Sequence, residues 1–557
     1  MAHKNYHLGA VALLFVTASL HAQSPQDAGT LLREQQTRPA PGPAQRGSVT
    51  TVPDTRDSKP AAPEGRLTVR QFRLEQNTRY GQSELSAVLA PLTGKPLTFS
   101  QLAAALTAIQ DYYRQGGFLA RAFFPPQDVD NGVVRITVVE ARVGAITAEG
   151  SGQGNAIDFI KSRVGAGDFL NVDALSAAVT ILNEQNGVQA RARLAPGKAA
   201  AETDIEMHIE ESTRNSGLIE DNNFGSRATG RFQTNVGVSA TNPFGVYDQL
   251  SVRGTLNGGG IRFVRVDYSR PLGTQGLRAG LNMSTLDYRI TQAAFAALGS
   301  EGRASTWGGI LSYPLVRRDQ LSVSTYLSGD SKLLNDTSLG VSQKNARIRL
   351  GTLGFTASLA DAMGSGNTDL AISVGHGTLN LADPTLDARD TRGSFSKLGW
   401  SIQRQQTLNK EFALSASVLG QWAGKNLDSA ERIALGGPYG IRAYPVGEGI
   451  GDEALMFKLS LTHPISARLG ASLFVEGGRV TLNKNLYTGW NGANPNLPNR
   501  YSLAGAGAGL DYQMGKFAVS AVLAAKIGNN PGRDTNGNDT DGSHSRMRGW
   551  LTARYAF

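Results

Sequence analysis

The sequence predicts an α+β region followed by an all-β region, in which two small α/β units precede a sixteen-stranded transmembrane β-barrel. A short apolar stretch stands at the N-terminus, and the order β-α-α-β-β occurs twice between residues 66 and 213. Residues 214–557 consist of segments of about ten residues that alternate apolar and polar side chains. Clusters of Gly, Asn, Asp and Ser separate these segments, as turns between strands require.

The composition narrows the classes of protein to consider. The chain has 557 residues, 66 glycines, no cysteine and a formal net charge of +9 from 55 basic and 46 acidic side chains. Its mean hydropathy of -0.23 and the lack of any long apolar run after the start exclude a helical membrane protein. They do not exclude a barrel, because a lipid face and a water face average out. Without cysteine there are no disulfides or thiolate sites. The basic residues are scattered, so no nucleic-acid partner is expected.

Residues 1–22 are predicted to be a secretory signal peptide. Lys4 precedes the apolar run 8–20, and that run is too short to span a bilayer comfortably. Small residues at Ala18 and Ala22 suit the cleavage position. The alternative is a retained membrane anchor. A signal peptide places the mature protein beyond the inner membrane.

A short helix and a linker follow. Residues 23–37 are predicted to form one helix, with proline near its first turn and Leu31 and Leu32 as its apolar patch. Residues 38–65 contain six prolines among polar and charged residues, a composition that builds no core. We therefore expect an extended linker, which suits a helix that docks away from the domain after it.

Two α/β units occupy residues 66–141 and 142–213. Helical spacing of apolar residues alternates in each with short runs of β-branched residues. The expected elements of the first are strand 69–74, helices 83–90 and 100–115, and strands 119–124 and 132–141. Those of the second are strand 142–148, helices 156–164 and 171–183, and strands 189–194 and 204–210.

Residues 214–557 are predicted to form the barrel, with about sixteen strands, an even number as single-chain bacterial barrels have. One segment carries Phe232, Val236 and Val238 on a single face, interleaved with Gln233 and Asn235. The polar face predicts a wet lumen rather than a packed core. A soluble β-sandwich or propeller is the alternative, but no blade-like repeat is visible.

The last strand and the aromatic residues fit this prediction. Tyr555 and Phe557 share one face of the final segment, and a terminal aromatic at this register looks like the barrel-assembly signal of an outer-membrane protein. Further aromatics are expected in girdles at the membrane interfaces. These are Tyr247, Tyr268, Trp307, Tyr313, Trp400 and Trp422.

The order of these parts resembles the outer-membrane transporters of two-partner secretion, the B components that export haemolysins and filamentous adhesins. The two α/β units resemble polypeptide-transport-associated (POTRA) domains. In the first unit the matching residues are Tyr113, Gly117, Phe118, Arg121, Pro126 and Gln127, with Phe118 where the family usually has tyrosine. The turn Asn242–Gly245 with Asp248 resembles the turn after the first barrel strand.

The most specific match lies in residues 436–445, which resemble the V-R-G-Y loop of this superfamily. Gly440, Arg442 and Tyr444 carry the match. The F-x-D-x-G strand motif is matched by Phe474, Glu476 and Gly478, with glutamate for aspartate. The resemblance implies that the loop folds into the barrel and that Arg442 meets Glu476. A partly solvated Arg–carboxylate pair can fix such a loop; the alternatives are a solvated loop arginine and an ordinary luminal charge.

No catalytic chemistry is expected. The sequence has no H-E-x-x-H, G-x-S-x-G or phosphate-loop motif, so no enzyme activity, metal or cofactor is predicted. Asp534, Asn536 and Asn538 begin like a calcium loop, but its glycine and glutamate positions hold Asp539 and Ser545. Residues 529–544 are therefore expected to be a solvated hairpin loop.

The resemblance implies an outer-membrane pore of a Gram-negative cell that captures an unfolded partner exoprotein through periplasmic POTRA domains and secretes it through the lumen. The helix 23–37 would close the resting pore. The partners implied are a β-helical adhesin or haemolysin-like exoprotein, outer-membrane lipids and the barrel-assembly machinery. Two alternatives are an assembly factor of the same superfamily and a diffusion porin.

Overall fold

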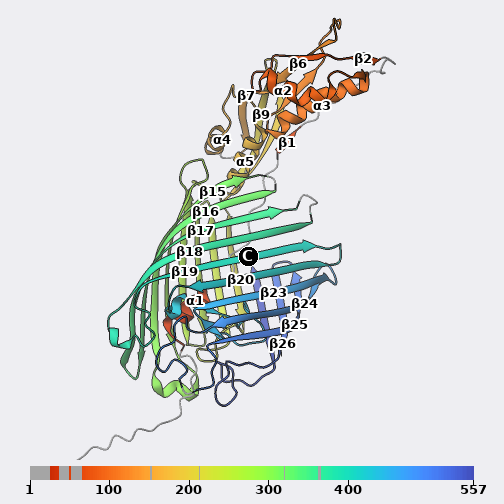
Figure 1. Ribbon diagram of the computed structural model, residues 1–557. Coiled ribbons are helices and arrows are strands. Elements are labelled where there is room, and N and C mark those ends of the chain that lie inside the picture. The colour runs from red at the N-terminus through yellow and green to blue at the C-terminus, as the bar shows by residue number, and fades with distance from the viewer. Residues whose placement is uncertain are drawn as a thin grey trace, which may run out of the picture.

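The computed structural model is an elongated molecule in which two α/β units stand in line beyond one end of a closed barrel (Figure 1). It describes residues 26–36, 49–51, 66–150, 153–211, 214–318, 320–361, 365–492 and 494–557. The predicted signal peptide and most of the predicted linker lie outside the described residues. None of the described helices is long and apolar enough to cross a membrane.

The first unit has the predicted β-α-α-β-β order with a two-stranded ribbon added. Its main sheet has the order β3-β6-β5, and β2 pairs with β4 separately. The helix α3 begins at a capping box, in which Gln101 N donates to Thr98 Oγ1 at 3.3 Å and Thr98 N donates to Gln101 Oε1 at 2.9 Å. The elements are β2 (Arg66–Thr68), β3 (Gln71–Glu75), α2 (Gln82–Leu89), the 3-10 helix η1 (Ala90–Leu92), β4 (Pro96–Thr98), α3 (Phe99–Gln115), β5 (Ala120–Phe123) and β6 (Val133–Glu140).

The second unit repeats this order and adds a strand from the linker. Within the predicted linker, residues 49–51 pair in parallel with the edge of the unit's sheet, whose order is β1-β8-β9-β7. The helix α5 starts at Asn171, whose Oδ1 accepts a hydrogen bond from Ala174 N at 2.8 Å. The elements are β1 (Val49–Thr51), β7 (Arg142–Gly150), α4 (Gln153–Lys161), α5 (Val172–Asn183), β8 (Val188–Pro196) and β9 (Glu202–Glu211).

The barrel has sixteen antiparallel strands, which confirms the predicted fold class. In chain order these are β10 (Arg214–Asn222), β11 (Gln233–Thr241), β12 (Gln249–Asn257), β13 (Ile261–Pro271), β14 (Arg278–Arg289), β15 (Glu301–Arg317), β16 (Leu321–Ser338), β17 (Val341–Ala360), β18 (Gly366–Leu381), β19 (Gly393–Thr407), β20 (Ala413–Ala423), β23 (Glu453–Pro464), β24 (Leu469–Thr481), β25 (Arg500–Met514), β26 (Phe517–Ile527) and β27 (Met547–Ala556).

Short elements join these strands. Three of them, η4, β21 and β22, lie in the long connection between β20 and β23, which enters the lumen. The described short elements between the barrel strands are the 3-10 helices η2 (Ala293–Leu298), η3 (Pro384–Leu386) and η4 (Ser429–Glu431), and the two-residue strands β21 (Ile433–Ala434) and β22 (Ile450–Gly451).

The two faces of the barrel wall follow the alternation of the sequence. Val238, Leu353 and Ile372 point outward and are 49%, 48% and 48% exposed.

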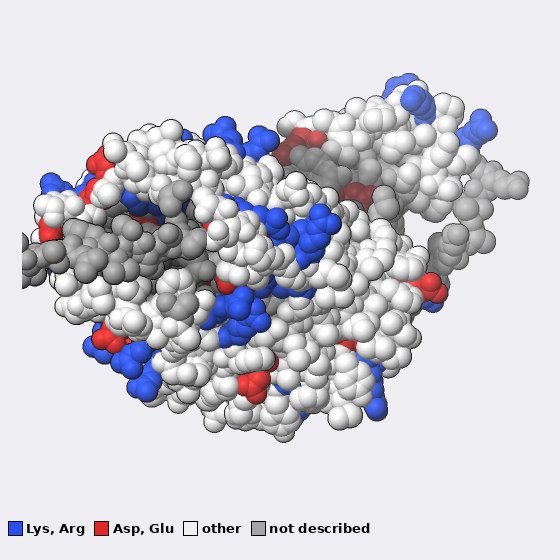
Figure 2. All heavy atoms as spheres, turned by 90° about the horizontal axis from the view of Figure 1, so that it is seen from below, with Lys and Arg blue, Asp and Glu red and all other residues white. Residues whose placement is uncertain are grey.

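The turn Asn242–Gly245 follows β11, the second barrel strand, so its assignment to the first strand was wrong. The strand that sequence reasoning did not separate is β10, which follows directly after the second unit. On the barrel face opposite the α/β units, Lys and Arg are more prominent than Asp and Glu (Figure 2).

The barrel closes between its first and last strands. The pairing of β10 with β27 comprises the five residue pairs from Leu218–Ala556 to Asn222–Thr552. The backbones of Gly217 and Phe557 extend it by exchanging two hydrogen bonds of 2.9 Å. Phe557 and Tyr555 are about half exposed on the outer face, and their rings stack with centroids 6.3 Å apart. Both predicted assembly-signal residues therefore lie at this closing seam.

Candidate functional site

The helix α1 (Ala28–Gln36) lies inside the barrel (Figure 1). Its first turn is tied to the wall, since Ala28 N donates to Asp336 Oδ1 of β16 at 2.8 Å. Lys344 of β17 forms an ion pair of 3.3 Å with Asp27, the residue before the helix. At the other end, the side chain of Thr255 on β12 donates to Gln35 Oε1 at 3.1 Å. The helix is thus anchored to strands on two sides of the lumen.

An apolar part of the wall receives the helix. Leu31 and Leu32 are fully buried. The residues that share their cluster are Ala28, Ile261, Phe263, Leu286, Tyr288, Ala304, Leu334, Ala346, Ile348, Leu350, Leu379, Phe395, Ala423, Leu427 and Ala430. The predicted wet lumen therefore contains an apolar part, which sequence reasoning did not foresee. Where α1 docks, the luminal side chains of β13–β19 are apolar, because two leucines need a dry surface to pack against.

The segment around η4 forms the other side of this seat. Glu431, which is fully buried, pairs with Lys332 of β16 and Lys397 of β19, each at 2.6 Å. Asp428 pairs with Lys344 at 2.7 Å. The three lysines come from three strands on one side of the barrel, so they hold η4 against this part of the wall by buried, charge-assisted hydrogen bonds. None of the three was singled out from the sequence; each is a lysine at a luminal position of a strand, which is the pattern that could have revealed it.

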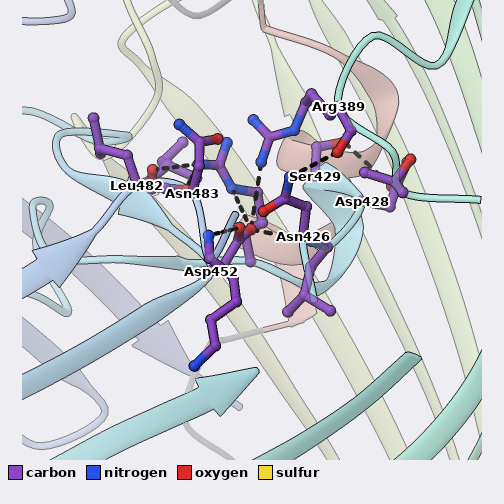
Figure 3. A network of polar contacts seen from close by, with 12 residues as sticks. Arg389, Asn426, Asp428, Ser429, Asp452, Leu482 and Asn483 are labelled. Carbon is purple, nitrogen blue, oxygen red and sulfur yellow. Dashed lines mark hydrogen bonds and ion pairs between the residues drawn. The ribbon is translucent and has the colours of Figure 1, made fainter. Parts of the chain in front are cut away.

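A second buried carboxylate connects this segment to the loops at the far end of the barrel. Asp452 is fully buried and pairs with Arg389 at 3.4 Å and with Arg432 at 3.2 Å (Figure 3). It also accepts hydrogen bonds from the backbone N–H groups of Leu427, at 3.2 Å, and Lys484, at 2.8 Å. Three separate parts of the chain therefore meet on one carboxylate, and this fixes the loop that carries η4.

The lid loop, residues 435–449, folds back into the lumen. Arg442 Nε lies 2.8 Å from Glu476 Oε1 of β24, and Arg442 N donates to Glu476 Oε2 at 2.8 Å. The Arg442 guanidinium also lies over the Phe474 ring, 3.4 Å from its centroid. Glu476 is 1% exposed, so this pair is shielded from solvent. The structure thus brings together the residues of the two motifs.

The remaining motif residues support this contact. Tyr444 is fully buried in a cluster that includes Phe474. Gly440 sits where a Cβ atom would meet backbone, 2.9 Å from Leu435 C. On the wall, Gly478 leaves room for Leu435, whose Cδ2 would be 2.9 Å from an added Cβ. Gly505 of β25 likewise leaves room for Ala443, at 2.5 Å. Glycines on the luminal face let the loop lie directly on the strands.

The lid loop is held from a second side by the last hairpin. Trp550 Nε1 of β27 donates to Arg442 O at 2.8 Å. Glu448, which is fully buried, accepts hydrogen bonds from Asn530 Nδ2 and Thr540 N, each at 2.9 Å, and from Thr540 Oγ1 at 3.0 Å. Residues 529–544 form the predicted hairpin loop between β26 and β27, but the loop is not solvated throughout, since Asn530, Asp539 and Asp541 are buried. Asn530 and Thr540 fold inward because they meet the buried carboxylate of the lid loop.

The predicted motif of the first α/β unit forms its internal clasp and its joint to the second unit. Tyr113 Oη donates to Glu140 Oε1 at 2.6 Å, and Thr78 N and Arg79 N donate to the same oxygen at 2.9 and 2.8 Å. Burial raises the pKa of Glu140, but these hydrogen bonds outweigh it and hold that pKa below the ordinary value. Burial and the bond to Glu140 raise the pKa of Tyr113. The clasp is therefore a hydrogen bond from the Tyr113 hydroxyl to the ionised Glu140 carboxylate.

The joint follows directly in the chain. Gly117 has a φ of +81°, which glycine adopts without strain, and its carbonyl accepts a hydrogen bond from Val172 N at 2.8 Å. Phe118 forms an isolated bridge with Asn171 and packs edge-on to Phe169, with ring centroids 6.5 Å apart. These contacts attach the first unit to α5 of the second.

The other motif residues lie apart from the joint. Gln127 accepts from Arg135 N at 2.6 Å and donates to Arg135 O at 2.8 Å, while Pro126 O accepts from Arg135 Nη2 at 3.3 Å. Arg121 lies on β5, an edge strand. The motif therefore marks three places: the Tyr113–Glu140 clasp, the joint to the second unit, and the hydrogen bonds of Pro126 and Gln127 to Arg135 of β6.

A second joint connects the second unit to the barrel. Tyr247, in the turn between β11 and β12, is 2% exposed and packs in the core of the second unit, where its hydroxyl donates to Glu211 Oε1 at 2.6 Å. The prediction that Tyr247 is a girdle residue was therefore wrong, because the second unit covers the turn that carries it. Arg317 of β15 pairs with Glu184 at 2.6 Å. These contacts join the barrel to the second unit.

Comparison with known proteins places the chain among secretion proteins. The family described as haemolysin secretion/activation protein ShlB/FhaC/HecB matches residues 201–512, and the ShlB-type POTRA domain matches residues 67–141. The heme/hemopexin transporter protein HuxB of Haemophilus influenzae is 28% identical over 482 residues, which are 83% of this chain and 84% of that protein.

Two further relatives are CdiB proteins. The outer membrane transporter CdiB of Dickeya dadantii is 22% identical over 439 residues, covering 74% of this chain and 76% of its own. The structure of CdiB from Escherichia coli superposes with a TM-score of 0.74 at 19% identity and covers 95% of each chain. That similarity concerns the fold.

Proposed function

Since the chain belongs to the ShlB/FhaC/HecB family of haemolysin secretion/activation proteins, we propose that α1 and the lid loop close its lumen at rest and move to let cargo pass. The protein is an outer-membrane transporter that secretes a partner exoprotein; it is not an enzyme. The observation that carries the proposal is the double obstruction of the lumen, by a helix in an apolar seat and by a loop fixed to the wall.

The helix acts as a plug because many contacts hold it against the barrel wall, yet none of them prevents it from leaving the lumen. Its two leucines account for a large buried apolar area, whereas its ends are held by single polar contacts to β16, β17 and β12. Deleting residues 24–37 is expected to raise the conductance of the protein in planar bilayers and to leave secretion intact. An unchanged conductance would refute the plug.

The lid loop acts as a latch through Arg442 and Glu476. A buried ion pair with one partner removed leaves an uncompensated charge, so the loop is stable only while both are present. Arg442→Ala is expected to expose the lid loop to protease and to lower secretion. If neither changes, the latch role is wrong. Phe557 and Tyr555 are proposed to act earlier, during insertion by the barrel-assembly machinery.

Cargo is proposed to bind the first POTRA domain at the edge of β5. This strand lies at the end of the order β3-β6-β5, and the flanking Leu119 and Phe123 are 41% and 38% exposed. An extended segment can add to such an edge through backbone hydrogen bonds, with apolar side chains supplying contact area. Leu119→Ser with Phe123→Ser should weaken secretion without changing the conductance.

The partner is proposed to be a large β-helical exoprotein of the adhesin or haemolysin kind. The name of HuxB states a heme/hemopexin transporter, which makes a haem-acquisition exoprotein a second candidate. Co-expression with the signal-bearing product of the neighbouring gene, followed by assay of the medium, tests the pairing. Depletion of the protein that altered the general outer-membrane proteome would instead favour an assembly factor.

A further inference from the structure

We propose that the exported chain passes through the periplasmic half of the lumen along one side only, a neutral polar surface on β17–β20, and that this surface fits extended polypeptide of any charge. The inference rests on the export function. The neutral wall is defined by the luminal side chains of Thr352, Thr356, Ser373, Ser401, Gln403, Ser415 and Ser417.

The register of the strands places these residues on one surface. Ser401 pairs with Ala371, and Ser417 pairs with Gln403 on the next strand. The alternate residues, such as Phe355, Ile402 and Val418, are 42%, 46% and 40% exposed on the lipid side. Because side chains alternate along a strand, the residues of the neutral wall face the lumen. The ionisable luminal side chains of these four strands stand at their ends.

Those end charges frame the wall. Asp369 lies near the periplasmic end of β18, whereas Lys344 and Lys397 lie beside α1 and are engaged by Asp428 and Glu431. Between them, Gly375 and Gly399 carry no side chain, which widens the path. Hydroxyl and amide groups both donate and accept hydrogen bonds, so they can satisfy the exposed peptide groups of an extended chain in any register.

The facing wall has a different chemistry. On β12 and β13, Arg265 pairs with Asp267 at 2.6 Å and Arg253 approaches the same carboxylate at 3.8 Å. A cavity of about 470 Å³ lies against this side, lined among others by Ser251, Arg265 and Lys332. Fixed charges attract or repel the charged side chains of a passing chain. A heteropolymer of mixed charge therefore moves more evenly along the neutral wall.

The neutral wall also leads to the seat of α1. Thr352 is the luminal neighbour of Leu350 on β17, and Leu350 belongs to the apolar cluster that packs around Leu31 and Leu32. When α1 leaves, the cluster becomes the continuation of the path toward the cell surface. The apolar seat can then take up the apolar side chains of the cargo in place of the two leucines.

The absence of cysteine permits a direct test. Ser373→Cys and Ser417→Cys place a single thiol on the neutral wall, and Ser251→Cys places one on the charged wall as a matched luminal serine. The probe is an unstructured Gly/Ser/Asn peptide of about 30 residues, which spans about 100 Å when extended, with a thiol-reactive methanethiosulfonate at one end. It is added to the purified full-length protein, and each rate is divided by that with small, neutral methyl methanethiosulfonate.

The normalised rate at the two neutral-wall thiols is expected to exceed that at the Ser251 position by about fivefold or more, as local enrichment of the bound peptide requires. Replacing a fifth of the peptide with Asp or with Lys should change the rate at the neutral wall little. Equal rates on the two walls, a faster reaction at Ser251→Cys, or no peptide reaction at either wall would overturn the proposal.

Secretion by the same variants separates this inference from the export function. Co-expressed with the exoprotein of the neighbouring gene, Ser417→Arg should reduce secretion severalfold, and Ser251→Arg should leave it near the unsubstituted level. If both arginine variants secrete normally, the neutral wall is refuted while export stands. If the unsubstituted chain secretes nothing, export by this pairing is refuted instead.

Discussion

Replacing Gly29 by valine isolates the contact between α1 and η4. A Cβ atom at Gly29 would lie 2.8 Å from Ala430 N and 3.2 Å from Ala430 Cβ, and closer still to the hydroxyl of Ser429. The Ser429 hydroxyl can rotate, but Ala430 N is backbone and cannot. Valine forms helices no less readily than glycine, so the substitution does not weaken α1 itself. The substitution therefore weakens only the packing of α1 against η4.

The expected magnitude follows from the packing. Overpacking a close contact costs about 1–3 kcal/mol, which shifts the equilibrium between seated and displaced helix by about 5- to 150-fold. Leu31 and Leu32 remain buried in the variant, and removing either one would cost about 2–5 kcal/mol. Gly29→Val should therefore open the pore part of the time, and Gly29→Val with Leu31→Ala should open it most of the time.

Single-channel recording in planar bilayers measures this directly as the fraction of time spent in the large-conductance state. Gln36→Val is the control, because it introduces the same side chain at the last, half-buried position of the helix, away from η4. It should behave like the unsubstituted protein. If Gly29→Val shows no rise in open fraction while the protein is folded by circular dichroism, the contact at η4 does not hold the helix in place.

Three further results are expected. Glu476→Gln should cost about 3–5 kcal/mol of lid-loop stability, as loss of one partner of a buried pair does, and a double-mutant cycle with Arg442→Ala should show strong coupling; additive effects would contradict the pairing. Glu448→Ala should increase hydrogen exchange at Thr540 N, and unchanged exchange would rule out the anchoring contact. Because hydrogen bonds lower the pKa of Glu140 although burial opposes them, its contribution to stability is present above the ordinary value of 4.5 and is lost as the pH falls through the lowered value. Glu140→Gln should therefore flatten the acid unfolding of the first POTRA domain, followed by hydrogen exchange in the full-length protein.

The sequence made the barrel predictable because a period of two reports directly which residues share a face. The same signal is reversed near the seat of α1. On β17, Ile348 and Leu350 face the lumen whereas Arg347 and Arg349 face outward. That local reversal was present in the sequence and marks the part of the wall that needs a partner inside the barrel.

Other parts could not be predicted, for physical reasons. Strands of two or three residues, such as β2 and β21, carry too little pattern to distinguish them from loop. The inward folding of residues 529–544 depends on Glu448, more than eighty positions away, and on Asn530 and Thr540 meeting it in space. Arg442 and Glu476 could be paired because a known motif order linked them, whereas the lysines that hold Glu431 had no such guide.

The two joints, one between the periplasmic domains and one between the second domain and the barrel, have a consequence for how cargo reaches the pore. Backbone bonds at Gly117, packing at Phe118 and the insertion of Tyr247 leave little freedom between β5 and the barrel mouth. With the proposed capture at β5, the bound segment is held at a set distance from the entrance, and the residues next to it search only a small volume. Their local concentration at the mouth reaches the order of millimolar. Entry then becomes an event within one complex, and its rate does not depend on how much exoprotein the periplasm contains.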